Sequence, residues 1–426
     1  MRDVRLAYGQ QGLMIRVPDA ATVVAPRRLP AVADAPTDLR RAMREPVAGR
    51  PLRDRVTRGQ SVAISVCDVT RPQPRELMVA AVLDELTGLV DDNDVTVLIA
   101  TGTHRHSTPA ELEAMLGRQL LDRINVVDHD SRDRASLAWL GRFGDDVPVW
   151  LNRAWVDADV RITTGFVEPH FFAGFSGGPK MVAPGLAGLD TVLTLHDARR
   201  IGSAQATWGV CEGNPVHDDV RAIATATGVD FSLDVILNAD QAIVAAFGGD
   251  VLAMHERARE RVRQTAMVAV PHRFDVVVTT NSGYPLDQNL YQSVKGMSAA
   301  ATIVKQGGTI VCAAECRDGF PDHGGFREVL ASAPTAAALG QMIAGRDHTE
   351  PDQWQVQVLA RVLARAQVIV HSARLGAAEL AAAHLGSTDD VSHAVSQALA
   401  QAGPGASLCV LPEGPQTIPY LGRGPG

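Results

Sequence analysis

The sequence is short of lysine, cysteine and aromatic residues. Only three of its 40 lysines and arginines are lysines, Lys180, Lys295 and Lys305, and aromatic residues make up 4% of the 426 residues. Because arginine supplies nearly every plain positive charge, a retained lysine marks a position where a primary amine can act as a nucleophile, which a guanidinium cannot do. Lys180 draws attention first, because it stands in a glycine-rich run.

Other absences exclude whole classes of protein. Five scattered cysteines, an odd number, argue against a disulfide framework and favour a reducing cytoplasm, and Cys312 and Cys316 lack the second pair of a zinc site. The N-terminus lacks the apolar stretch of a signal peptide, and no apolar run is long enough to span a membrane. Charge is interspersed, with a formal net charge of −8. A cytoplasmic protein with neither a nucleic-acid nor a membrane partner is therefore expected.

Short apolar runs alternate with helical patterns along the chain. This alternation predicts βαβ units with mostly parallel sheets. After a hairpin in residues 1–25 and a helix near Leu39, the first half has expected strands at 61–67, 95–100, 124–128 and 160–164, and helices at 75–89, 109–116, 189–200, 216–227 and 251–267. The second half has expected strands at 274–280, 309–312, 368–371 and 407–411, and helices at 287–304, 335–344, 354–364 and 392–401.

The predicted fold class is α/β, with two α/β domains, mostly parallel sheets and an active site in the cleft between them. A boundary is expected near Pro271. The N-terminal domain would span residues 1–270 and the C-terminal domain residues 271–402. The segment 403–426 is expected to pack back on the N-terminal domain.

Unusual polar loops directly follow four of the expected strands. They are DVTR at 68–71, GTHR at 102–105, EPH at 168–170 and the segment 281–295. Ligands of open parallel sheets bind outside the carboxyl ends of the strands, so the shared placement predicts an active site. Each residue also has a structural interpretation: a cap or ion pair for Asp68 and Arg71, a hydrogen-bonded position for a histidine, a solvated helix face for Gln292 and Lys295.

The chemistry open to these residues is acid–base catalysis on an anionic substrate. Two histidines can act as general acid and base near neutral pH. Arg71 and Lys295 can bind a carboxylate, and the glycine N–H groups of the Lys180 run could cradle a phosphate. Met181 follows Lys180, so no Walker motif is present, and no glycine fingerprint opens a βαβ unit. Several aromatic residues could line a pocket for the substrate's R group, although core packing fits most of them: Phe171, Phe172, Phe175, Trp208 and Tyr284.

Six motifs resemble those of the nickel-dependent lactate racemase family, and together they cover nearly the whole chain. They are DVTRPQP, ATGTHR, EPHFFAGFSGGPKMVAPG and YPLDQNLYQSVKGMSAA, with the opening LAYGQQGLMIRVPD and the closing VLPEGPQTIPYL. The resemblance implies a nickel-pincer nucleotide (pyridinium-3,5-bisthiocarboxylic acid mononucleotide nickel) attached covalently to Lys180, with His196 as the protein ligand to nickel. Gly177, Gly178 and Asp68 are the other residues expected at the cofactor.

The resemblance also implies a reaction. His104 and His170 match the acid/base pair, and the residues expected at the substrate are Arg71, Gln292, Lys295 and Tyr291. The implied activity is racemisation or epimerisation of a 2-hydroxy acid, lactate or a related acid, by reversible hydride transfer to the tethered cofactor. Cofactor biosynthesis and maturation proteins are the implied partners, and a homo-oligomer is left open. The alternatives are a cofactor-free ligand-binding or sensor protein of the same fold, or an epimerase of a larger hydroxy or sugar acid.

Overall fold

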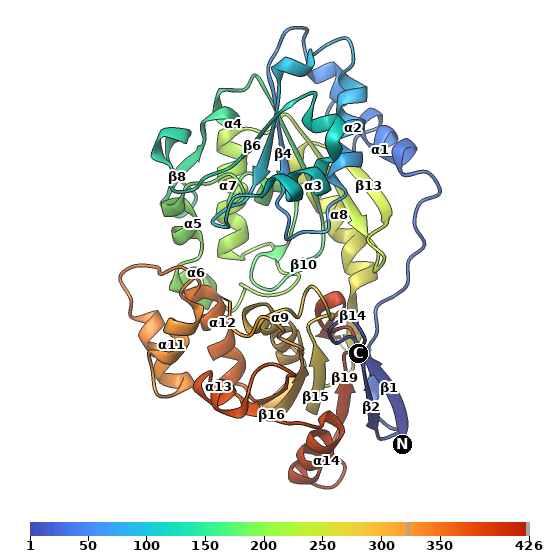
Figure 1. Ribbon diagram of the computed structural model, residues 1–426, viewed down its shortest axis with the longest axis vertical. Helices are drawn as coiled ribbons and strands as arrows, with labels where there is room; N and C mark the ends of the chain where they lie inside the picture. The colour runs from blue at the N-terminus through green and yellow to red at the C-terminus, as the bar shows by residue number, and fades with distance from the viewer. Residues whose placement is uncertain (322–323, 423–426) are drawn as a thin grey trace. The chain divides into compact units, whose positions relative to one another are not determined.

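The computed structural model describes residues 1–321 and 324–422 (Figure 1). Its contacts divide the chain into two compact units. The first, here the Lys180 unit, comprises Arg28–His196 and Ala204–Arg263. The second, here the Lys295 unit, comprises Met1–Arg27, Asp197–Ser203 and the chain from Gln264 onward. Each unit is described by itself.

The Lys180 unit is built on a six-stranded sheet in the order β13-β12-β9-β4-β5-β6. All neighbours are parallel except β12 and β13, an antiparallel pair at one edge. The strands are β4 (Val62–Cys67), β5 (Val95–Ala100), β6 (Asn125–Asp128), β9 (Val160–Phe166), β12 (Phe231–Leu237) and β13 (Ile243–Gly249). Every residue of β4 is buried, as expected for a continuous apolar run inside a parallel sheet. The mostly parallel sheet predicted from the sequence is therefore confirmed.

Helices cover both faces of this sheet (Figure 1). Alternate residues of β4 point to opposite faces: Ile64 and Val66 join one core, whereas Ala63 joins the other. The first core is completed by α1 (Ala35–Arg44), α2 (Arg75–Leu86) and α3 (Pro109–Leu121), and the second by α4 (Arg153–Asp157), α5 (Leu189–Leu195) and α7 (Pro215–Thr227). The long helix α8 spans Val251–Ala266.

Two hairpins in this unit were not expected from the sequence. Strands β7 (Leu137–Phe143) and β8 (Val147–Asn152) form an antiparallel pair in which the rings of Trp139 and Trp150 lie 5.1 Å apart. Strands β10 (Pro169–His170) and β11 (Gly174–Phe175) form a very short one. The second hairpin matters for function because it contains His170.

The Lys295 unit holds a second six-stranded sheet, in the order β18-β17-β16-β15-β19-β3, with every neighbouring pair parallel. Its strands are β15 (Phe274–Thr280), β16 (Val304–Ala313), β17 (Ala366–His371), β18 (Gly386–Ser387), β19 (Leu408–Val410) and β3 (Thr22–Val23). Its helices are α6 (Ala198–Gly202), α9 (Leu290–Ala301), α10 (Phe326–Ala331), α11 (Ala336–Ala344), α12 (Gln353–Leu363), α13 (Ala377–Ala382) and α14 (Val391–Ala402). Two small sheets complete it: β1 (Arg2–Leu6) with β2 (Leu13–Val17), and β14 (Met267–Val270) with β20 (Ile418–Leu421).

Both ends of the chain differ from the expected domain division. The segment from residue 403 was expected to pack on the N-terminal domain, residues 1–270. Its strand β19 pairs instead with β15 in the second sheet, and its strand β20 pairs with β14, which precedes residue 271 but belongs to the Lys295 unit. The N-terminal strand β3 in turn pairs with β19. Short edge strands of two or three residues carry little sequence signal, so their partners could not be read from the pattern. Residues 423–426 of this segment lie outside the described chain.

The helix expected over 189–200 is two helices. Helix α5 ends at Leu195, and Asp197 caps the start of α6 by accepting a hydrogen bond from the Arg200 N–H at 2.7 Å. An aspartate before an Ala-Arg run is a typical helix N-cap, so this break carried a readable signal. His196 consequently lies at the C-cap of α5 rather than inside a helix. No helix of the described residues is both long and apolar enough to cross a membrane.

Candidate functional site

The order of strands marks one place in the first sheet as a binding site. From β4, the chain adds β5 and β6 on one side and later places β9 and β12 on the other. Ligands of doubly wound sheets bind at such a reversal, outside the carboxyl ends of the strands. Asp68 and Arg71 follow β4, and His170 follows β9, so the loops that hold them flank this point. His104 follows β5, the next strand.

Asp68 orients His104. The Nδ1 atom of His104 lies 2.6 Å from Oδ2 of Asp68. The other carboxylate oxygen of Asp68, Oδ1, accepts a hydrogen bond from the Thr70 hydroxyl at 2.7 Å. Burial alone would raise the pKa of Asp68, but the hydrogen bond and charge of His104 and the charge of Arg71 outweigh it and lower that pKa. An ionised carboxylate only accepts, so the His104 proton sits on Nδ1 and the lone pair of the neutral ring is on Nε2. Asp68 was expected at the cofactor; its contact in this structure is with His104.

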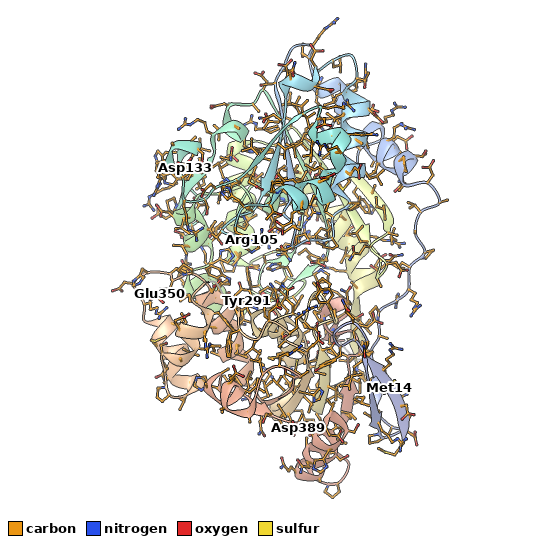
Figure 2. The ribbon with its side chains drawn as sticks, in the orientation of Figure 1. Met14, Arg105, Asp133, Tyr291, Glu350 and Asp389 are labelled. Carbon is orange, nitrogen blue, oxygen red and sulfur yellow. The ribbon has the colours of Figure 1, made fainter. Side chains whose placement is uncertain are left out.

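The loop that carries His104, residues 101–108, has half of its residues exposed and is held by charged groups. Arg105, which is labelled in Figure 2, forms two hydrogen bonds to Glu111, at 2.6 and 2.8 Å. Thr108 caps α3, and Glu111 returns a hydrogen bond to the Thr108 N–H, which completes a capping box. His106 lies 3.4 Å from Asp130. We call this segment the His104 loop.

His170 is held in the opposite way. Its Nδ1 faces the backbone N–H groups of Ala173, at 3.2 Å, and of Phe172, at 3.5 Å. Both groups donate, so Nδ1 carries the lone pair and the proton of the neutral ring is on Nε2. The ring also stacks on Phe171, with centroids 4.9 Å apart. The two candidate acid/base histidines therefore rest in opposite tautomers.

Phe172 brings together three of the residues singled out from the sequence. The centroid of its ring lies 4.5 Å from that of His170, 5.2 Å from that of His196 and 5.7 Å from Nζ of Lys180. The ring is 4% exposed, and Asn214 fixes its backbone by donating to the Phe172 carbonyl oxygen at 2.8 Å. The sequence offered only an aromatic residue beside a histidine, which packs in a core far more often than it organises a site.

The glycines before Lys180, whose N–H groups could have cradled a phosphate, contact other parts of the protein instead. Gly177 and Gly178 have φ angles of 72° and 51°, which only glycine adopts readily. The Gly178 N–H donates to Oδ2 of Asp234 at 2.6 Å, so it is not available to a phosphate. A Cβ on Gly177 would lie 2.5 Å from Oδ2 of Asp234, and one on Gly178 would lie 2.6 Å from the His255 ring. Residues 168–181, which contain these glycines and Lys180, are called the Lys180 loop below.

Two buried histidines lie beneath the Lys180 loop. The rings of His217 and His255 stack with centroids 5.8 Å apart, and each residue is 1% exposed. Burial first, then the positive charge of Arg259, lowers the pKa of His217 to about 3 and that of His255 far below its usual value, and Lys180 contributes to both. Both rings are thus neutral at pH 7. No sequence signal marks either residue, since each looks like an ordinary helix position.

His196 is arranged as a metal ligand would be. It is 8% exposed, and its Nδ1 donates to the Val192 carbonyl oxygen at 2.7 Å, which leaves the lone pair of the neutral ring on Nε2. Metal-binding histidines typically donate the other ring N–H to a carbonyl or carboxylate in this way. Within residues 1–321 and 324–422, no three His, Cys, Asp or Glu side chains are grouped to hold a metal ion. A metal at His196 would therefore take its other ligands from a bound group, which fits the cofactor implied by the resemblance.

In the Lys295 unit, the candidate residues line one helix at the reversal point of the second sheet. Strand β15 is flanked by β16 on one side and β19 on the other, and the loop after β15 leads into α9. On α9, Nζ of Lys295 donates to Oε1 of Gln292 at 2.7 Å, which confirms their shared face. The hydroxyl of Tyr291 (Figure 2) accepts from Nε1 of Trp354 at 3.2 Å. The ammonium of Lys295 and the amide of Gln292 can together bind a carboxylate.

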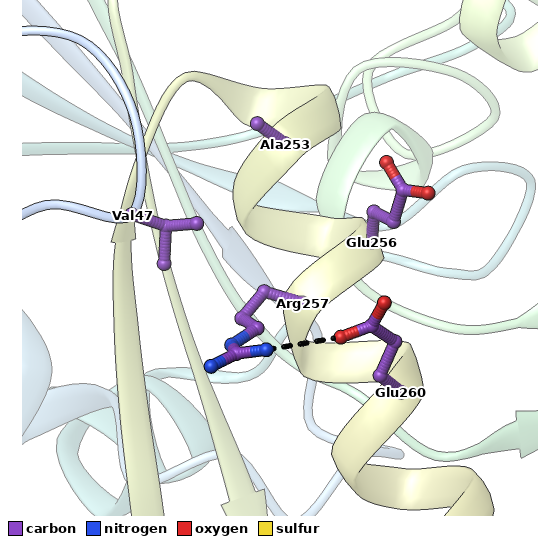
Figure 3. Close-up of a pocket in the computed structure, with 5 residues that line it drawn as sticks. All are labelled: Val47, Ala253, Glu256, Arg257 and Glu260. Carbon is purple, nitrogen blue, oxygen red and sulfur yellow. Dashed lines mark hydrogen bonds and ion pairs between the residues drawn. The ribbon is translucent and has the colours of Figure 1, made fainter.

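A surface pocket elsewhere has a different character. It lies along the outer side of α8 and is lined by Val47, Ala253, Glu256, Arg257 and Glu260 (Figure 3). Arg257 and Glu260, three residues apart on α8, form an ion pair at 3.2 Å. None of the candidate residues lines this pocket, so it is not the functional site.

The chain is similar to known lactate racemases along most of its length. The profile of the lactate racemase N-terminal domain matches residues 8–209, and that of the C-terminal domain matches residues 270–418. A lactate racemase from Thermoanaerobacterium thermosaccharolyticum is 38% identical over 333 residues, 78% of each sequence. One from Lactiplantibacillus plantarum is 33% identical over 375 residues, 88% of each.

Solved structures agree with this similarity. The structure of the lactate racemase apoprotein from T. thermosaccharolyticum matches with a TM-score of 0.93 and 33% identity, over 98% of this chain and 100% of that one. A protein from Thermotoga maritima shares the fold, with a TM-score of 0.65 at 18% identity over 91% of this chain and 98% of its own. The two α/β domains with mostly parallel sheets are thus confirmed. The chain belongs to the lactate racemase family and is an isomerase.

Proposed function

We propose that this protein racemises a 2-hydroxy acid, lactate or a close relative, with His104 and His170 as the acid/base groups. The observation that carries the proposal is the convergence of His170, Lys180 and His196 on the ring of Phe172. Two histidines and a primary amine surround this one side chain, and these are the residue types that the proposed proton transfer, metal ligation and covalent tether require. Relatives named lactate racemases supply the substrate class.

Lys180 and His196 would hold a nickel-pincer nucleotide, the amine as covalent tether and Nε2 of His196 as the protein's ligand to nickel. His196 would add one imidazole nitrogen to the ligands that the cofactor itself brings to nickel. When bound, this group supplies the acceptor and donor of hydride for the Cα–H bond of the substrate. Cofactor biosynthesis and maturation proteins are the partners that this proposal requires.

The chain's own residues move protons and orient the substrate. His104 takes the hydroxyl proton at Nε2, and Asp68 stabilises the imidazolium by accepting its Nδ1–H, at 2.6 Å in this structure. His170 holds a proton at Nε2 and is set to donate to the substrate oxygen on the other face. The two histidines exchange these roles for the opposite enantiomer. Arg71, Lys295 and Gln292 would bind the carboxylate end of the substrate, so that the carbonyl group of the planar 2-keto acid can turn its opposite face to the returning hydride without leaving the site.

Chiral separation of products over a panel of 2-hydroxy acids tests this proposal. The protein is co-expressed with cofactor-maturation proteins, and nickel and intact mass are measured on the same preparation. We expect racemisation of at least one short 2-hydroxy acid by protein that contains nickel and carries a mass adduct lost in Lys180→Ala. Nickel-loaded, adducted protein that racemises no acid of the panel would overturn the proposed reaction. Binding of a hydroxy acid without nickel or adduct would support the alternative of a ligand-binding protein.

A further inference from the structure

A buried carboxyl group lies beneath the turn that carries Lys180. Asp234, on β12, is fully buried, and its Oδ2 accepts the Gly178 N–H at 2.6 Å. Gly178 is the first residue of the 3₁₀ turn Gly178–Met181, so Asp234 caps this turn from a distant strand. Its Oδ1 has no hydrogen-bond partner in the described structure. Burial raises its pKa to about 7. A carboxyl with one hydrogen bond costs more to bury than an apolar side chain of the same size, so packing alone does not account for it.

The backbone around Asp234 is shaped to admit it. A Cβ on Gly165, the residue paired with Asp234 on β9, would lie 2.9 Å from Oδ1. One on Gly177 would lie 2.5 Å from Oδ2 and 2.8 Å from the Phe166 carbonyl oxygen. Two glycines from two segments, Gly165 and Gly177, thus open the space in which the carboxyl reaches the Gly178 N–H. Gly178 itself is explained by the His255 ring instead.

Two further buried groups hold the same turn on either side of Lys180. His255 donates from Nε2 to the Ser176 carbonyl oxygen at 2.8 Å, before the turn. Ser65 donates from its hydroxyl to the Met181 carbonyl oxygen at 2.8 Å, directly after Lys180. Neither group reaches the turn's own first N–H. Asp234 is therefore the contact that fixes the direction in which the turn leaves Gly177.

We propose that Asp234 is the positioning residue of Lys180: by capping the turn Gly178–Met181 it holds the Lys180 backbone where the amine can take up the cofactor. This inference rests on the proposed function, because the covalent tether is part of it. The role needs an acceptor at Oδ2 and does not need a charge. Asparagine should therefore replace Asp234, whereas leucine, of similar size, should not.

The test compares three variants of the full chain, co-expressed with cofactor-maturation proteins. Asp234→Leu removes the acceptor, Asp234→Asn keeps it, and Ser232→Ala is the matched control. Ser232 lies two residues away on the same strand and forms a buried hydrogen bond to Thr163 at 2.6 Å, but among the described residues no hydrogen bond joins it to the Lys180 loop. Intact mass should show about tenfold less adduct in Asp234→Leu, because an unpaired buried N–H displaces the turn, and wild-type levels in the other two.

Hydrogen exchange of the cofactor-free protein gives a second readout. The amides of Gly177, Gly178, Lys180 and Met181 should exchange about tenfold faster in Asp234→Leu and at the wild-type rate in Asp234→Asn and Ser232→Ala. Wild-type adduct and exchange in Asp234→Leu would overturn the inference. An Asp234→Asn variant that folds normally but has about tenfold less adduct and about tenfold faster amide exchange would overturn it as well. This second variant keeps the inference testable if Asp234→Leu does not fold. Absence of adduct from the wild type itself would count against the proposed function, and exchange alone would then decide the role of Asp234.

Discussion

The His104 loop and the Lys180 loop carry the two proposed acid/base groups but are held by opposite means. The His104 loop lies at the surface, and the carboxylates of Asp68 and Glu111 hold it through His104 and Arg105. The Lys180 loop is mostly buried and is held by backbone hydrogen bonds, by glycines and by the buried Asp234 and His255. Charge therefore sets the geometry of the first loop, and shape sets that of the second. The first should respond to salt, the second to single added atoms and to protonation of the histidines buried beneath it.

The largest effect expected is on turnover. Replacing either His104 or His170 by alanine should lower racemisation by about 10²–10⁴-fold, because each supplies general acid–base catalysis. The two variants should differ in stability: the His104 side chain is 49% exposed, whereas the His170 ring packs on Phe171 and Phe172. Chiral chromatography and thermal unfolding measure both properties. Turnover within about threefold of wild type in either variant would refute the use of two histidines.

A glycine-to-alanine substitution should destabilise the Lys180 loop more than the His104 loop, because the Lys180 loop is more tightly packed. Gly178→Ala places a Cβ 2.6 Å from the His255 ring at a φ of 51°, and should cost about 3 kcal/mol in the free energy of unfolding. Gly102→Ala, in the His104 loop, has a similar φ of 57°, but its nearest neighbour is the Pro184 carbonyl oxygen at 3.6 Å. It should cost only about 1 kcal/mol, for the backbone conformation alone. Urea titrations measure the free energy of unfolding of both variants. Equal losses would show that the His255 side chain moves aside for the added methyl group at little cost.

Acidification should lower the free energy of unfolding, because the imidazoles buried beneath the Lys180 loop do not take up protons in the folded protein. The pKa of His217 is about 3 in the folded protein, whereas an unperturbed histidine has a pKa of 6.5, so between these values only the unfolded chain takes up the proton. The contribution of His217 is therefore complete above pH 6.5 and is lost as the pH falls toward 3, on the order of 2–4 kcal/mol. His217→Gln should flatten the pH dependence of unfolding in this window. A variant with the wild-type slope would mean that His217 titrates normally.

The smallest effect should come from the surface ion pair of the His104 loop. Hydrogen bonds from Arg105 lower the pKa of Glu111 from 4.5 to about 2, so its contribution is present above pH 4.5 and is lost as the pH falls toward 2. Glu111→Gln keeps the cap of α3 and should cost less than about 0.5 kcal/mol at pH 7. At about 1 M salt the difference should disappear, because exposed charges are screened. A cost that persists in high salt would show that the loop is held by packing instead.

The sequence predicted the parts of the site that adjoin a strong local pattern. Asp68 and His104 follow apolar runs of strand length, so their place at strand ends could be read directly, as could the shared helix face of Gln292 and Lys295. What the glycines touch could not be read. Asp234 lies 56 residues after Gly178 (234 − 178) and His255 lies 77 residues after it (255 − 178). Only the folded structure brings these two side chains beneath Gly178. Nothing in the local sequence around a strand aspartate or a helix histidine predicts that it will contact these glycines.

The same limit explains the differences in the fold. Long buried strands such as β4 and β15 are visible because their apolar runs are continuous. The β7–β8 hairpin and the two-residue strand β3 are too irregular or too short for periodicity to mark them. Their partners depend on contacts across the whole chain, which no local window contains.

The pairing of β3 with β19 has a consequence for how the protein is made. The sheet of the Lys180 unit is complete in sequence once β13 ends at Gly249, while the ribosome still has the remainder of the chain to add. The second sheet must wait, because β3 at residues 22–23 joins β19 at 408–410. Since domains tend to fold as they emerge, the unit with Lys180 and His196 has all its strands available first. During synthesis the N-terminal segment stays without its sheet partner until the last strands of the chain are translated.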